Sequence, residues 1–281
     1  MASRSRRART ASSSGSPADP PLGTAVPIAS GTARLVPEAD GGVLLEVNGV
    51  QSSYHHPDPE HLVFEYMRWM DTVARQLLPT PQDGDGLEMG HLGGGACTLA
   101  RAFAAHWPGA KQTVVEIDGP LVDLVRSGLD LPRPPRMKVR VGDAAEVLRS
   151  WRDDRFTLLV RDVFSGDTTP QELRTSAAAA EARRVVRPGG TYLLNVASAP
   201  GTSVIAAELG ALSEAFEHLA VIAEPAQLQG KRRGNVVIAA GDDPLPAGLD
   251  RALRADAVTV RLADQAVVAE LTRRGRATLG L

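Results

Sequence analysis

Three consecutive glycines and a glutamate about 20 positions later form the pattern in this chain that most clearly indicates a ligand-binding site. Gly93, Gly94 and Gly95 end one apolar run, and Glu116 ends the next. Glycine permits positive φ and lets a ligand approach the backbone, and the helix expected next offers free N–H groups. A carboxylate at the end of the second strand can accept hydrogen bonds from both hydroxyls of a ribose. We interpret the pattern as a nucleoside-binding βαβ unit. The alternative is a tight strand–helix turn with an incidental acid.

Three further acidic residues follow predicted strands. Asp143 and Asp162 come just after strands expected over 137–141 and 156–160, and Asp167 lies in the loop after Asp162. Ligands of a doubly wound sheet bind beyond the carboxyl ends of its strands. Asp143 could therefore accept the exocyclic amine of an adenine, and Asp162 would face the reacting part of the ligand. For each of these residues a solvated loop acid is the alternative.

An alternation of apolar strands and helix-forming segments must position these acids. We expect strands at 87–92, 112–117, 137–141, 156–160, 191–196, 218–223 and 235–240, and helices near 96–107, 119–129, 144–152, 170–186, 202–216 and 264–274. Such alternation indicates a mostly parallel sheet that is covered on both faces. The connection 229–234 is too short for a helical crossover, so the last two strands should be antiparallel. The expected fold is a doubly wound, Rossmann-like α/β sheet with an antiparallel last strand.

The N-terminal part of the chain has a different pattern. Alternating runs at 32–37, 42–47 and 50–54 are joined by turns, one of them Asn48-Gly49, and predict a small β-hairpin appendage. Asp58-Pro59 is expected to start a helix that runs to Leu77, with Asp as N-cap and Pro at the first position. The predicted organisation is a disordered tail over 1–23, a hairpin segment over 24–57 and a Rossmann-like domain over 58–281.

Composition excludes several classes of protein. The 281 residues carry a net charge of −2, which argues against a general nucleic-acid binder. The one cysteine, Cys97, allows no disulfide within the chain, fits a cytoplasmic protein, and is interpreted as a packing residue rather than a nucleophile. No apolar stretch approaches the roughly 20 residues of a membrane span. The basic N-terminus leads into Ser, Gly and Pro rather than an apolar signal region.

The order of these motifs resembles that of the spermidine synthases, which are aminopropyltransferases with a Rossmann domain like that of S-adenosylmethionine methyltransferases. The resemblance covers about residues 32 to 241. It rests on the following segments: Gly93-Gly94-Gly95, Val114-Val115-Glu116-Ile117-Asp118, Gly142-Asp143-Ala144, Asp162, Val50-Gln51-Ser52-Ser53 and Phe64-Glu65.

The resemblance implies a role for each matching position. The donor would be decarboxylated S-adenosylmethionine, and no metal is expected. Glu116 would hold the ribose, Asp143 with the Ala144 backbone the adenine, and Gln51 would face the nucleoside from the appendage. The backbone of 93–95 would lie under the sulfonium. Asp162 would take a proton from the attacking amine, and a homodimer is expected.

The sequence departs from the family pattern around the acceptor. Ala96 stands where the family has an aspartate for the aminopropyl ammonium, and Ser165 stands where it has a second acid for the acceptor. Its Tyr-x-Glu element is altered around Glu65, which stays a candidate for substrate binding, as does Asp167. Two other functions therefore stay open. One is a methyltransferase that uses intact S-adenosylmethionine on a small molecule, and the other is a degenerate nucleoside-binding subunit.

Overall fold

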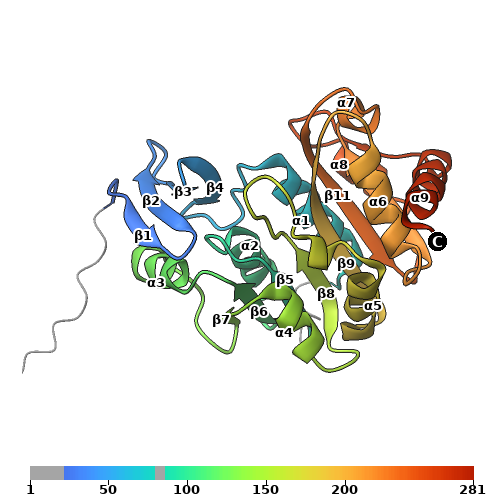
Figure 1. Ribbon diagram of the computed structural model, residues 1–281. Helices are drawn as coiled ribbons and strands as arrows, with labels where there is room; N and C mark the ends of the chain where they lie inside the picture. The colour runs from blue at the N-terminus through green and yellow to red at the C-terminus, as the bar shows by residue number, and fades with distance from the viewer. Residues whose placement is uncertain (1–21, 80–85) are drawn as a thin grey trace, which may run out of the picture.

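Two sheets make up the framework of the protein. The computed structural model describes residues 22–79 and 86–281. Their strands form a four-stranded and an eight-stranded sheet, and Figure 1 shows the smaller sheet at one end of the molecule. The predicted tail over 1–23 lies almost wholly outside the described residues. Within these residues, no helix is both long and apolar enough to cross a membrane.

The larger sheet has the order β12-β10-β11-β9-β8-β5-β6-β7. Its strands are β5 (Glu88–Leu92), β6 (Lys111–Glu116), β7 (Met137–Val141), β8 (Phe156–Arg161), β9 (Val186–Ser198), β10 (His218–Ala223), β11 (Gly234–Gly241) and β12 (Arg261–Leu262). The pairings from β9 through β8, β5 and β6 to β7 are parallel, and β11 pairs antiparallel with both β9 and β10. The expected mostly parallel, Rossmann-like sheet is confirmed. The short β12, also antiparallel, adds an edge strand that the sequence pattern did not predict.

Helices cover both faces of this sheet because its strands are apolar on both sides. Helices α4 (Ala144–Ser150), α5 (Ser176–Val185) and α6 (Ser203–Leu212) share one core with the sheet, and α9 (Gln265–Leu279) packs against α6. Helices α1 (Glu65–Leu77), α2 (Thr98–His106) and α8 (Leu249–Leu253) contribute to the core on the opposite face. A one-turn helix, α7 (Pro225–Leu228), lies between β10 and β11. Neither α7 nor α8 was predicted.

The N-terminal sheet has the order β1-β2-β3-β4 and is antiparallel throughout. Its strands are β1 (Val26–Ile28), β2 (Gly31–Pro37), β3 (Val43–Val47) and β4 (Val50–His55). The predicted Asn48-Gly49 hairpin is present, with both residues at positive φ as this type of tight turn requires. The inner face of the sheet packs on α3 (Gly119–Gly128), which gives this part of the chain a small core of its own.

Two helix starts differ from the predicted ones. Helix α1 begins at Glu65 rather than at Asp58, because the Asp58 side chain accepts the N–H of Glu60 and closes a local turn instead. Helix α5 begins at Ser176 rather than at 170, because the Thr175 hydroxyl caps it by accepting the N–H of Ala178. The strand expected from 191 also begins earlier, at Val186, where it pairs with the start of β8.

Candidate functional site

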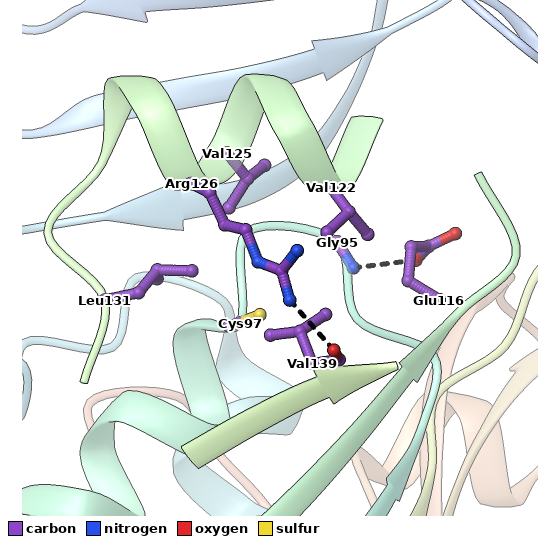
Figure 2. Close-up of a pocket in the computed structure, with 8 residues that line it drawn as sticks. All are labelled: Gly95, Cys97, Glu116, Val122, Val125, Arg126, Leu131 and Val139. Atoms are coloured by element: carbon purple, nitrogen blue, oxygen red, sulfur yellow. Dashed lines mark hydrogen bonds between the residues drawn. The ribbon is translucent and has the colours of Figure 1, made fainter. Parts of the chain in front are cut away.

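The glycine turn after β5 and the carboxylate of Glu116 at the end of β6 face each other. The backbone N–H groups of Gly94 and Gly95 each donate to Glu116 Oε2 at 3.1 Å, and the bond from Gly95 is drawn in Figure 2. The Asp118 N–H donates to the other carboxylate oxygen at 3.1 Å. Gly93 has φ +93, and a Cβ there would lie 2.0 Å from the carbonyl oxygen of Asp162. The turn therefore requires glycine at position 93. The absence of a side chain there lets the backbone of Gly93 lie against the backbone of Asp162.

A narrow hollow, too small to admit a ligand, lies behind this turn, between α3 and β7. The Arg126 side chain lies across it and donates to the Val139 carbonyl oxygen at 2.9 Å, as Figure 2 shows. The buried Cys97 lines the hollow, and burial raises the pKa of its thiol to about 12. A thiol that stays protonated at neutral pH is a poor nucleophile. This result supports the interpretation of Cys97 as a packing residue.

Exposed apolar side chains lie beside Glu116 along the ends of two strands. Ile117, directly after β6, is 65% exposed, and Val141 at the end of β7 is 50% exposed. Asp143 follows at the N-cap of α4, where its Oδ1 accepts the N–H of Glu146 at 2.9 Å. The next residue, Ala144, is buried as the first residue of the helix. The structure therefore gives Asp143 a capping role, while binding of an adenine by this residue stays a prediction.

Asp162 follows β8 at the same edge of the sheet, and two polar side chains hold it. The Tyr66 hydroxyl donates to Oδ2 at 3.0 Å, and the Asn195 amide donates to Oδ1 at 2.9 Å. Burial raises the pKa of the Asp162 carboxyl, and the two hydrogen bonds oppose that rise only in part. Burial also raises the pKa of Tyr66 well above its usual value, so its hydroxyl stays protonated and remains a donor.

Tyr66 and Asn195 are the partners of Asp162 that the sequence analysis missed. Tyr66 lies on α1 and Asn195 on β9, so they are 96 and 33 positions away from Asp162 in the chain. Asn195 was detectable in principle as a lone amide within the apolar run of a central strand, where a buried polar group needs a partner. Tyr66 carried no such signal, because it fits the apolar stripe of its helix.

The N-terminal sheet contacts the glycine turn through β4. The Ala96 N–H donates to the Ser53 hydroxyl at 3.2 Å, and the Thr98 hydroxyl donates to the Tyr54 carbonyl oxygen at 2.9 Å. Gln51, on the same strand, is exposed, and it pairs with Glu46 of β3. The Ser53 side chain therefore touches the turn, and contact of Gln51 with a nucleoside stays a prediction.

The two further candidates for acceptor binding lie in different surroundings. Glu65 is the first residue of α1 and directly precedes Tyr66, so it starts the helix that reaches Asp162. The side chain of Asp167 is 73% exposed and forms an ion pair with Arg233 at 2.8 Å. The structure thus places Glu65 next to the tyrosine that contacts Asp162, and it pairs Asp167 with an arginine at the surface.

The comparisons with known proteins identify the family. No family model matches the sequence, and no curated protein matches it. Among solved structures, a probable spermidine synthase from Corynebacterium glutamicum is 36% identical with a TM-score of 0.84, over 90% of this chain and 94% of that chain. The chain therefore belongs to the spermidine synthase family, and the resemblance seen in the sequence is confirmed.

More distant structures share the fold. The spermidine synthase of Thermotoga maritima has 14% identity and a TM-score of 0.62, over 92% of this chain and 88% of that chain. A spermidine synthase in complex with the transition-state analogue AdoDATO has 15% identity and a TM-score of 0.63, over the same shares. Human methyltransferase-like protein 13 in complex with SAH has 17% identity and a TM-score of 0.54, over 77% of this chain and 93% of that chain.

Proposed function

We propose that this protein is an aminopropyltransferase that moves an aminopropyl group from decarboxylated S-adenosylmethionine to an amine. The observation that carries the proposal is the position of Asp162 directly against the glycine turn. The Asp162 N–H donates to the Leu92 carbonyl oxygen at 2.8 Å, one residue before Gly93. A nucleoside held at Glu116 would thus have its sulfur end near a half-buried carboxylate. Family membership and the AdoDATO complex of a distant relative support this donor.

The donor's adenosine would use the features at the ends of β6 and β7. Glu116 would hold the ribose with its partly exposed carboxylate. Three backbone N–H groups leave about one of its four acceptor sites for the first ribose hydroxyl, and the second hydroxyl would take the place of one backbone donor. Exposed Ile117 and Val141 offer apolar surface to the flat face of an adenine, and its exocyclic amine would donate to Asp143. The glycine backbone would lie beneath the sulfonium, where a side chain would obstruct it.

Asp162 would act on the attacking amine. An alkylamine has a pKa of about 10.4 and arrives protonated, so it must lose a proton before it can attack. A carboxylate beside the ammonium attracts it and can accept that proton. The nitrogen lone pair then forms a bond to the aminopropyl carbon, and the carbon–sulfur bond breaks. Its electron pair goes to sulfur, which leaves as the neutral thioether of methylthioadenosine. A neutral leaving group needs little acid assistance, so positioning of the two substrates contributes most.

An assay of methylthioadenosine release from the decarboxylated donor, with a panel of diamines and monoamines, tests this proposal. We expect release that depends on an amine, and Asp162→Asn should lower turnover by about 10²- to 10⁴-fold, the usual contribution of a general base. Methylthioadenosine affinity should stay within about threefold, because the carboxamide keeps the shape of the side chain. Asp153→Asn is the matched control, because this acid is exposed and pairs with Arg184.

Methyl transfer is the second candidate, and the fold shared with a methyltransferase-like protein that binds SAH favours its inclusion. The same assay separates the two reactions. Formation of S-adenosylhomocysteine from intact S-adenosylmethionine, with no methylthioadenosine from the decarboxylated donor, would replace our proposal with a methyltransferase. Equal turnover of Asp162→Asn and the unmodified protein would remove Asp162 as the base.

A further inference from the structure

Two histidines and an aspartate converge on the N-terminal side of α1, outside the candidate active site. Asp40, His56 and His61 each place one ligand atom within 4.8 Å of the others. The His56 and His61 rings lie 4.3 Å apart between centroids. Asp40 comes from the turn between β2 and β3, and the histidines from the segment between β4 and α1. Ligand atoms about 2.1 Å from a tetrahedral zinc ion lie about 3.4 Å from one another, so side-chain rotations that shorten these separations by up to about 1.4 Å would bring all three into range.

Neighbouring groups already orient two of these side chains. The Tyr54 hydroxyl and the Gly42 N–H both donate to Asp40 Oδ1, which leaves Oδ2 to bind a metal ion. The Asp58 N–H donates to His56 Nδ1 at 3.1 Å, and the Asp58 carbonyl oxygen lies 3.3 Å from the same nitrogen. Binding of an ion at Nε2 would therefore move the ring proton to Nδ1, where it would donate to that carbonyl oxygen. Metal-binding histidines commonly donate their other ring N–H to a backbone carbonyl, and metal-binding carboxylates are usually hydrogen-bonded as well.

We propose that Asp40, His56 and His61 form a Zn²⁺ site that joins the β2–β3 turn to the segment leading into α1. Two imidazoles and one carboxylate suit Zn²⁺, whereas Mg²⁺ and Ca²⁺ prefer sites made of oxygen. The side chains of Asp40 and His61 are exposed and His56 is half-buried, so the ion can enter from solvent and water can complete its coordination. The spacing in sequence concealed the site, since a hairpin separates Asp40 from the histidines.

The proposed ion would strengthen a connection that the structure already contains. Arg101 of α2 donates to the His56 carbonyl oxygen at 3.1 Å, which fixes the start of the same segment to the Rossmann-like part. The segment then leads into α1, whose Tyr66 contacts Asp162. A ligand that binds only the folded chain stabilises it. Zn²⁺ should therefore raise the melting temperature and act on stability rather than on the chemistry of transfer.

The test uses the untagged full chain after treatment with a chelator. Competition with a chromophoric chelator should show one Zn²⁺ per chain, and Co²⁺ in its place should give visible absorption bands of low-symmetry coordination. Removal of a residue that only orients a metal-binding side chain lowers metal affinity about 10- to 100-fold. His61→Ala removes a metal-binding side chain itself, so it should lower Zn²⁺ affinity at least about tenfold. Zn²⁺ should raise the melting temperature of the unmodified protein but not of the variant.

His218→Ala supplies the matched control, because His218 is a partly exposed histidine on β10 of the other sheet. It should bind Zn²⁺ as the unmodified protein does. Three results would overturn the proposal: no binding at micromolar Zn²⁺, equal binding by the double variant His56→Ala/His61→Ala, or a preference for Mg²⁺. None of these readouts depends on transferase activity, so they stay separate from the test of the proposed function.

Discussion

At the scale of single residues, the environment of Asp162 explains how an aspartate could serve as a base near neutral pH. An ordinary aspartate, with a pKa of about 3.9, is a weak base at pH 7. Burial moves the pKa of Asp162 upward, toward the range in which a base accepts protons more readily, while Tyr66 and Asn195 keep the carboxylate oriented. Desolvation thus raises the pKa of the Asp162 carboxyl, while the hydrogen bonds lower it.

The variant Tyr66→Phe should shift the acidic limb of the pH profile of kcat/KM. Its hydroxyl stabilises the charged form of Asp162, so its loss raises the pKa of that carboxyl further. Asp162, the proposed base, is then protonated up to a higher pH, and the limb should move toward higher pH by about one unit. Tyr54→Phe is the control, because the Tyr54 hydroxyl contacts Asp40 instead. A limb that is unchanged in Tyr66→Phe would show that this hydroxyl does not tune the base.

Residue-scale reasoning from the sequence could single out residues where a known spacing carried the signal. The glycines and Glu116 have such a spacing, and the structure brings them into contact, while their binding of a nucleoside stays a prediction. It failed for Tyr66 and Ser53, since their partners lie far along the chain and neither residue type is unusual in its own segment. A side chain that acts through a distant partner has no local pattern to reveal it.

At the scale of elements, periodicity predicted the central strands well and the ends of helices less well. Turn signals are ambiguous, since Asp58 can cap a helix or close a turn, and here it closes a turn. The edge strand β12 pairs over Ile222 and Ala223 only, so it depends on tertiary contact more than on its own sequence. Such elements have too few residues to show a period.

The contact between α6 and α9 depends on glycine. A Cβ on Gly275 would lie 1.8 Å from the Ala206 carbonyl oxygen, and one on Gly210 would lie 2.6 Å from Gly275. Gly275→Ala should therefore lower the free energy of unfolding by about 1–3 kcal/mol, as overpacking does, in spite of the better helix propensity of alanine. Urea denaturation measures the change.

Gly119→Ala in α3 is the matched control for that substitution. A Cβ there would meet Val141 at 3.6 Å, an ordinary contact. This variant should be neutral or slightly stabilising. If Gly275→Ala had the same free energy of unfolding as Gly119→Ala, α6 and α9 would not pack as closely as the structure shows.

At the scale of the whole molecule, the candidate site is assembled from both sheets. Asp118, just after β6, accepts the N–H groups of Ala29 and Ser30, and Ser53 of β4 accepts from the glycine turn. The N-terminal sheet is thus fixed to the end of the Rossmann-like sheet at which the carboxylates gather. Sequence patterns predicted that both parts exist, but these contacts could not be predicted, because each joins segments more than 40 positions apart.

Calorimetric titration of methylthioadenosine is the most direct test of the claim that Glu116 and the glycine turn form a nucleoside site. The unmodified protein should bind it, and Glu116→Ala should weaken binding by about 10- to 150-fold, as expected for lost hydrogen bonds to a charged group. Glu217→Ala, an exposed acid elsewhere, should leave the affinity unchanged. Equal affinity of Glu116→Ala and the unmodified protein, with both folded by circular dichroism, would contradict the account.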